Sequence, residues 1–227
     1  QANSHKSEEG DLVMSIKTVE TGTSEAGVHI GAMYMLAGKQ YPTLLEANLE
    51  QIQNAVDADA KDIWVNINQK TRSISIRDNG NGANRAMFEQ ALNTVGHTLK
   101  SDDKIGRFGL GLCAPLGKCE RHTFTSTNRS NSNGYIEWTF DPLKIAEMKK
   151  LDIPWRTRPE MWFGDVRGGG RISNNWRTEI RMENYTTDRF INRLSMETLV
   201  EGVLKYNESM KRKGVVVHIT LVDSEGK

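Results

Sequence analysis

Three polar side chains recur at helical spacing in the segment that follows Thr43. Glu50, Asn54 and Asp57 occupy positions i, i+4 and i+7, so a helix would place all three on one face. A carboxylate on that face can act as a general base toward water, and a neutral amide oxygen can join phosphate oxygens around Mg²⁺. A solvated helix face has the same composition, so the choice between a hydrolytic nucleotide site and plain surface depends on other residues.

A second candidate group is an aspartate in register with a predicted core strand. Ile74, Ile76 and Asp78 are spaced by two, so the carboxylate shares the apolar face, where it is costly unless it is hydrogen-bonded. Gly80 and Gly82 follow it and would let the backbone approach a ligand closely. The amino group of adenine would be a suitable donor to Asp78. The alternative interpretation is an Asp-Asn-Gly turn that ends a hairpin, although the next residues favour a helix over a returning strand.

The glycine-rich segment at 106–111 has the order G-x-x-G-x-G. It matches neither the dinucleotide fingerprint, which is G-x-G-x-x-G, nor the P-loop, which ends in Gly-Lys-Ser/Thr. Backbone N–H groups ahead of a helix still form a cradle for anions, and a helix is predicted from about Leu112. The polar residues before the cradle suit a lid. The candidate phosphate-binding residues are Lys100, Lys104, Gly106, Arg107, Phe108, Gly109, Leu110 and Gly111, and the alternative for the charged ones is solvated surface.

The hydrophobic periodicity predicts the elements that position these groups. Leu45, Leu49, Ile52 and Val56 recur at helical spacing, which predicts a helix over 43–60 whose apolar side lies opposite the polar one. Alternating residues then predict a hairpin with strands at 63–67 and 74–76. Further strands are predicted at 121–126, 135–140, 178–182 and 215–221, further helices at 85–93 and 188–210, and loops at 128–133 and 164–175.

Length and composition fit one globular domain. The chain has 227 residues, of which 37% are hydrophobic and 26% charged, and its net charge is +1. That balance does not indicate a nucleic-acid partner, and no stretch reaches the ~18 apolar residues of a membrane span. The spacing of Cys113 and Cys119 does not match a metal site, so two reduced thiols in an intracellular protein are expected. We predict a tail or strap at 1–40 and one α/β domain at 41–227, with a largely antiparallel sheet covered on one face by helices and a flexible loop or insertion at 164–175.

The three polar groups, taken in order, resemble the N, G1 and G2 boxes of the GHKL ATPases, the superfamily named for gyrase, the large heat-shock chaperone, histidine kinases and MutL. The resemblance extends over most of the chain, from about residue 44 to residue 221. It implies the Bergerat ATP-binding fold, an α/β sandwich. The motifs that carry it are Glu50-x-x-x-Asn54-Ala55-x-Asp57-Ala58, Asp78-x-Gly80-x-Gly82 and Gly106-x-x-Gly109-x-Gly111.

The same resemblance implies a role for each box. Glu50 would be the general base that activates water, and Asn54 would be a ligand of Mg²⁺. Asp78 would be the carboxylate that reads adenine, with Gly82 lying against the base. The segment 106–111 would be the lid hinge that wraps the phosphates.

A fourth box, in which Gly-Thr opens a strand and the threonine helps to bind adenine, is assigned to Thr178. Arg177 stands where the family usually has glycine, and Gly214-Val215 is a competing assignment that lacks the hydroxyl. The segment 104–112 is similar to microrchidia-type ATPases, whereas the tip at 128–133 and the strand after it are similar to the large heat-shock chaperones.

The function that the resemblance implies is an ATPase that binds ATP and Mg²⁺, hydrolyses ATP slowly and couples lid closure to a larger chaperone-like or DNA-transaction-like machine. It also implies a homodimer formed through the lid and the N-terminal segment, an additional domain or partner chain, and a cytoplasmic location. Neither direct nucleic-acid binding by this domain nor membrane contact is expected. Two alternatives stay open, a non-hydrolysing nucleotide-gated scaffold and a protein histidine kinase of the same fold. Glu50 argues against the kinase, because kinases of this fold generally lack a carboxylate there.

Overall fold

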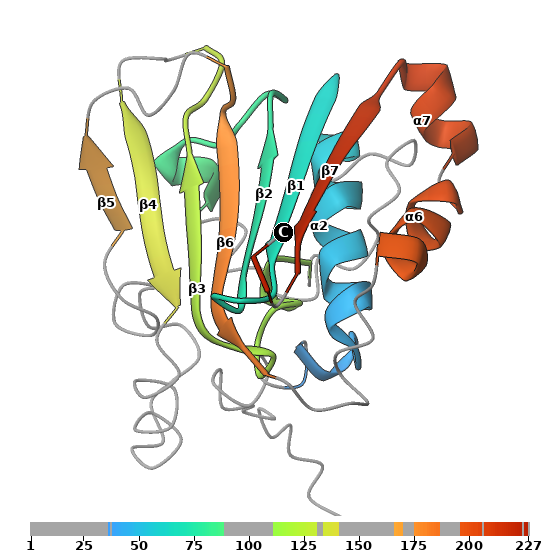
Figure 1. The fold of residues 1–227 in the computed structure, drawn as a ribbon. Helices are drawn as coiled ribbons and strands as arrows, with labels where there is room; N and C mark the ends of the chain where they lie inside the picture. The colour runs from blue at the N-terminus through green and yellow to red at the C-terminus, as the bar shows by residue number, and fades with distance from the viewer. Residues whose placement is uncertain are drawn as a thin grey trace, which may run out of the picture.

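The computed structural model describes residues 36, 38–88, 111–130, 134–140, 166–169, 175–186, 196–205, 207–223 and 225–226. Figure 1 shows their helices and strands. The helices are α2 (Leu44–Asp57), the short 3-10 helix η1 (Gly111–Cys113), α6 (Met196–Leu204) and α7 (Asn207–Lys213). The strands are β1 (Asp62–Asn68), β2 (Ser73–Asp78), β3 (Cys119–Ser126), β4 (Tyr135–Phe140), β5 (Val166–Gly169), β6 (Thr178–Tyr185) and β7 (Val216–Val222).

The strands form one sheet in the order β5-β4-β3-β6-β2-β1-β7. All neighbours are antiparallel except β1 and β7, which pair in parallel. Among the described elements, α2 lies along one face of this sheet, and α6 packs beside it (Figure 1). The predicted α/β fold, with a largely antiparallel sheet covered on one face by helices, is confirmed.

Helix α2 begins at a capping box. The Thr43 hydroxyl accepts a hydrogen bond from the Glu46 N–H at 3.1 Å, and the Glu46 carboxylate accepts one from the Thr43 N–H at 2.9 Å. This reciprocal pair satisfies backbone donors that a helix start leaves open. The capping box therefore fixes where the helix begins, and with it which residues face the sheet.

The main core lies between α2 and the centre of the sheet. Ile52 and Val56 on α2 pack in one buried cluster with the alternating isoleucines of β1 and β2, as the periodicity predicts. A smaller aromatic group lies under β3 and β4, where Phe88 stacks on Phe124 at 5.0 Å. Burial on this face decides strand register, because a one-residue slip would turn every apolar side chain outward.

Within the segment 164–175, which we predict to be a loop, residues Val166–Gly169 form β5 at the edge of the sheet. The loop prediction is therefore wrong for these four residues. Two of the four are glycines, which have low strand propensity, but pairing with β4 supplies the hydrogen bonds that hold them extended.

Two helix predictions also need correction. The helix expected from about Leu112 is only the three-residue η1, because Pro115 and Gly117, which has a φ of 75°, turn the chain soon afterwards. The single helix expected over 188–210 is two helices in the described part, α6 and α7. Asn207 begins α7, and asparagine favours helix starts.

Candidate functional site

Three polar side chains from neighbouring strands meet at one end of the sheet, on the face that α2 covers. In the β2–β6 pairing Asp78 is opposite Thr178, and in the β3–β6 pairing Ser126 is opposite the same Thr178. All three are buried, with 6%, 8% and 0% of their surface exposed, respectively. Because partners in register point to the same face, the sheet brings a carboxylate and two hydroxyls together.

The Asp78 carboxylate is buried with little compensation. Among the described residues it accepts a hydrogen bond from the Gly80 N–H at 2.9 Å, and no basic side chain pairs with it. Burial raises the pKa of Asp78 from 3.8 to about 6, against the smaller lowering effect of the Gly80 N–H. A carboxyl group with a raised pKa in an interior position is typical of a binding or catalytic site.

The loop after Asp78 passes between the end of α2 and the end of β3, and glycines are needed there. A Cβ at Gly80 would lie 2.7 Å from the Ala58 carbonyl oxygen. Gly82 has a φ of 65°, and a Cβ there would overlap the carbonyl oxygen of Thr127. The loop thus lies directly against backbone on both sides. Close approach of this loop to a ligand, which the glycine spacing predicts, stays a prediction.

At the other end of the site, η1 lies directly on α2. A Cβ at Gly111 would overlap the Glu50 carboxylate and would lie 2.6 Å from the Asn54 side-chain amide. The buried Gln51 side chain donates to the Gly111 carbonyl oxygen at 2.6 Å and so fixes this contact. The structure therefore brings together Glu50, Asn54 and the last glycine of the glycine-rich segment. Asp57, one helical turn further, is buried.

Seven of the predicted phosphate-binding residues lie outside the described residues, namely Lys100, Lys104, Gly106, Arg107, Phe108, Gly109 and Leu110. For the fourth box, the structure places Thr178 beside Asp78. Gly214, the competing assignment, lies in the turn just before β7, and β1 separates β7 from β2. The geometry therefore favours Thr178.

Sequence reasoning missed Ser126 and Lys118. Ser126 follows Phe124 at a spacing of two, so it is a polar residue on an apolar face, which is the signal that singled out Asp78. The ammonium group of Lys118 is buried and donates to the carbonyl oxygens of Gly38 and Ala114 at 2.8 and 2.9 Å. It ties the segment before α2 to the turn after η1, a contact between residues 80 positions apart that no local pattern indicates.

A family model described as "Histidine kinase-, DNA gyrase B-, and HSP90-like ATPase" matches residues 42–160, more than half of the chain. The chain belongs to this family of GHKL ATPases. The resemblance stated from the three boxes is confirmed at family level, and the fold is the Bergerat fold.

Two relatives of this GHKL domain share its sequence over part of its length. Chaperone protein HtpG of Oleidesulfovibrio alaskensis is 29% identical over 116 residues, which cover 45% of this chain and 18% of the relative. ATPase morc-1 of Caenorhabditis elegans is 42% identical over 73 residues, which cover 30% of this chain and 8% of the relative. The chain therefore matches less than a fifth of the length of either relative.

Solved structures agree on the fold. The N-terminal domain of a DNA repair protein superposes with a TM-score of 0.52 at 14% identity, covering 86% of this chain and 54% of the other. The ATPase region of Saccharomyces cerevisiae topoisomerase II bound to ICRF-187 superposes with a TM-score of 0.50 at 15% identity, covering 81% of this chain and 48% of the other. At such identities the likeness shows the fold alone.

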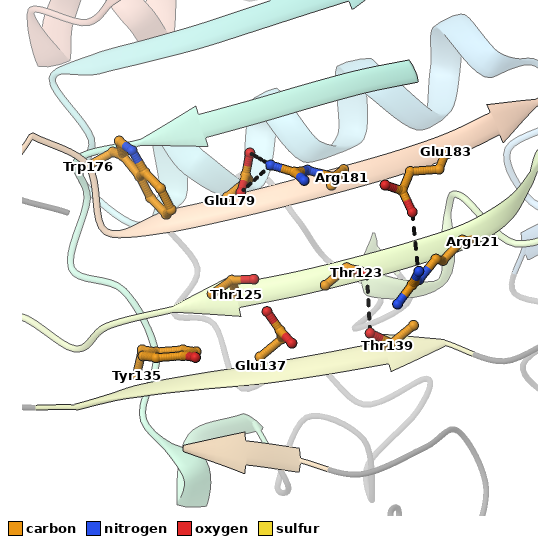
Figure 2. A pocket seen from close by; sticks show the side chains of 10 residues that line it. All are labelled: Arg121, Thr123, Thr125, Tyr135, Glu137, Thr139, Trp176, Glu179, Arg181 and Glu183. Atoms are coloured by element: carbon orange, nitrogen blue, oxygen red, sulfur yellow. Dashed lines mark hydrogen bonds and ion pairs between the residues drawn. The ribbon is translucent and has the colours of Figure 1, made fainter. Parts of the chain in front are cut away.

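The opposite face of the sheet of this GHKL domain carries a concave region. A hollow of about 510 Å³ lies over β4, β3 and β6, and Figure 2 shows its lining side chains. Its buried carboxylate, Glu179, is bonded to Arg77 at 2.9 Å and to Arg181 at 3.2 Å. Burial alone would raise the pKa of Glu179, but the Ser75 hydroxyl and the two guanidinium groups outweigh it and hold that pKa below its usual value. These contacts neutralise Glu179 within the fold.

The described residues include no group of three or more His, Cys, Asp or Glu side chains that could hold a metal ion by themselves. The described part of the chain also has no helix that is both long and apolar enough to span a membrane.

Proposed function

We propose that this domain binds Mg²⁺-ATP between α2, the loop 79–83 and the glycine-rich segment, and that it hydrolyses the nucleotide slowly. The observation that carries the proposal is the Asp78 carboxylate, which is buried beside a threonine hydroxyl without a cationic partner among the described residues. An exocyclic amino group is a donor of the kind that this carboxylate lacks. Adenine presents such a group beside a ring nitrogen that accepts.

The phosphate end of the proposed site is the contact between η1 and α2. Glu50 and Asn54 face the Gly111 backbone at a distance that leaves no room for a Cβ. Glu50 is the general base in this proposal, because its carboxylate adjoins the last glycine of the proposed phosphate-binding segment. The Asn54 amide oxygen suits Mg²⁺, which prefers hard oxygen ligands and would neutralise charge on the phosphates.

One helix relates the two ends of the proposed site. Ala58, at the C-terminal end of α2, contacts the loop beside Asp78, and Glu50 lies eight residues earlier on the same helix. Eight residues correspond to about 12 Å along a helix axis, a length that suits an extended nucleoside triphosphate. The fit supports a ligand that reaches from Asp78 to Glu50.

The proposal extends to the assembly. We expect the segments 1–40 and 96–110 to act as strap and lid, to form a homodimer, and to couple the nucleotide state to other domains or partner chains. The short match to each curated relative supports further domains, because the relatives are several times longer than the matched segment. One relative is named a chaperone and the other an ATPase, and both names agree with a nucleotide-driven machine.

The proposal is tested by titrating the chain with ATP, ADP and a non-hydrolysable ATP analogue, with and without Mg²⁺, while oligomeric state and phosphate release are measured. Saturable ATP binding and slow release of phosphate are expected. ATP binding without phosphate release would instead favour a nucleotide-gated scaffold, and phosphorylated protein would favour a kinase.

In Asn54→Ala, ATP binding should lose its dependence on Mg²⁺, because the proposed metal ligand is removed. An equal loss of ATP affinity with and without the metal would rule out Asn54 as the ligand.

A further inference from the structure

Ser126 joins the loop after Asp78 to the threonine of the proposed adenine site. Its hydroxyl oxygen accepts a hydrogen bond from the Ala83 N–H at 2.8 Å. The same oxygen lies 3.0 Å from the Thr178 hydroxyl oxygen. Ser126 is fully buried, with 0% of its surface exposed.

The two contacts of Ser126 fix the direction of the hydrogen bonds. A serine hydroxyl has one proton to donate, and the Ala83 N–H can only donate to it. Among the described residues, the acceptor within reach of the Ser126 proton is therefore the Thr178 oxygen. Either direction leaves one hydroxyl proton without an acceptor among the described residues, and this costs less on Thr178, which is 8% exposed, than on Ser126, which is 0% exposed, so the arrangement in which Ser126 donates and Thr178 accepts is the favoured one.

This direction leaves the proton of Thr178 available to a ligand. No described residue accepts it, and the side chain faces the same side of the sheet as Asp78, its partner in the β2–β6 pairing. Directly opposite residues have Cβ atoms about 5 Å apart. The site thus presents an acceptor, the Asp78 carboxylate, next to a committed donor, the Thr178 hydroxyl.

We propose that Ser126 is a positioning residue for purine selection, which holds the Thr178 hydroxyl as a donor and thereby favours adenine over guanine. The inference rests on the proposed nucleotide site. Adenine offers a donor, its amino group, beside an acceptor, its ring N1, which complements the carboxylate and the hydroxyl. Guanine offers the reverse order, an acceptor at O6 beside a donor at N1, so it would leave buried groups unpaired.

The test compares Kd values for Mg²⁺-ATP and Mg²⁺-GTP in the unsubstituted chain and in Ser126→Ala. Without Ser126, the Thr178 hydroxyl is free to rotate and can accept as well as donate. ATP affinity should fall about fivefold, the scale of one neutral hydrogen bond, while GTP affinity stays constant or rises. The ratio of the two Kd values is the decisive readout, because a general loosening of the fold would weaken both nucleotides together.

Two further variants separate positioning from packing. Thr127→Val removes a buried hydroxyl, one residue along the chain, that has no hydrogen-bond partner in the part of the chain that the structure describes, and it should leave the ATP-to-GTP ratio of Kd values unchanged. Thr178→Val removes the donor itself. If Ser126 acts through Thr178, then adding Ser126→Ala to Thr178→Val should not change the ratio further.

The outcomes are distinct. An ATP-to-GTP ratio of Kd values that rises in Ser126→Ala, but does not rise further when Ser126→Ala is added to Thr178→Val, supports the inference. An unchanged ratio in Ser126→Ala, or an equal loss for both nucleotides, overturns it while leaving ATP binding in place. Failure of the unsubstituted chain to bind ATP at all overturns the proposed function and this inference with it.

Discussion

Each face of the sheet buries a carboxylate, and the two differ in the partners that compensate the charge. Asp78 and Glu179 lie on neighbouring strands and are almost equally buried, at 6% and 7% exposed. Glu179 faces the open side, where two arginines and a serine neutralise it. Asp78 faces α2, where its hydrogen-bond partner among the described residues is a single backbone N–H, that of Gly80. Burial alone therefore does not mark a functional carboxylate, whereas burial without compensation does.

The strongest test of a functional difference between the two faces is to remove one carboxylate on the α2 side and one on the open side and to compare turnover. Glu50→Ala should keep ATP binding and lower turnover by about 100-fold or more, because the general base is lost. Glu137→Ala, which removes a carboxylate from the hollow on the open face, is the matched control and should keep normal turnover. Turnover is measured as phosphate release at saturating ATP. Normal turnover in Glu50→Ala would eliminate Glu50 as the base.

The pH dependence of the free energy of unfolding should reveal the buried Asp78 carboxylate on the sheet face that α2 covers. The pKa of Asp78 is about 6 in the folded chain and 3.8 in the reference state, so the folded state holds this proton more tightly. Stability from this group is therefore full below about pH 3.8 and is lost as pH rises to about 6, at a cost of up to about 3 kcal/mol. Urea unfolding of nucleotide-free protein across this range, compared with Asp78→Asn, measures it. Parallel pH profiles for both proteins would contradict the prediction.

Nucleotide affinity should respond to the inner carboxylate and not to the outer one. Asp78→Asn should weaken ATP binding by about 1–3 kcal/mol, the scale of a lost hydrogen bond to a charged group. Glu179→Gln should bind ATP as the parent does, because its side chain lies on the other face. Calorimetric titration measures both. Equal losses in the two variants would show that the effect is general rather than local.

The smallest expected effect belongs to the open face. Glu179→Gln should lower the free energy of unfolding by about 1 kcal/mol at neutral pH, since its partners Arg77 and Arg181 are partly solvated. The pKa of Glu179 is lowered, so this contribution is present above its ordinary pKa and disappears as pH falls. Denaturant unfolding at pH 7 and at pH 3 should show the difference only at the higher value. A difference that persists at pH 3 would point to packing.

The sequence predicts the central part of this arrangement because local rules decide it. The hydrophobic residues recur with a period of 3.6 in α2 and of 2 in β1 and β2, so these elements can be predicted from the sequence. Glycine is required at positions 80 and 82 because a side chain there would collide with neighbouring backbone. The Ser126–Thr178 bond is harder to find, because it joins strands 52 residues apart. Strand β5 forms because it pairs with β4, which outweighs the low strand propensity of its two glycines. The hydrogen bond from Lys118 to Gly38 joins residues far apart in the sequence, so no local pattern predicts it.

Asp78, Thr178 and Ser126 are brought together only by the correct alignment of three adjacent strands. A shift of one position in either the β2–β6 or the β3–β6 ladder would send a member of the trio to the opposite side of the sheet. A misaligned sheet therefore loses the complete trio. Under the proposed function, nucleotide uptake would then report the fraction of molecules whose strands have found their correct alignment.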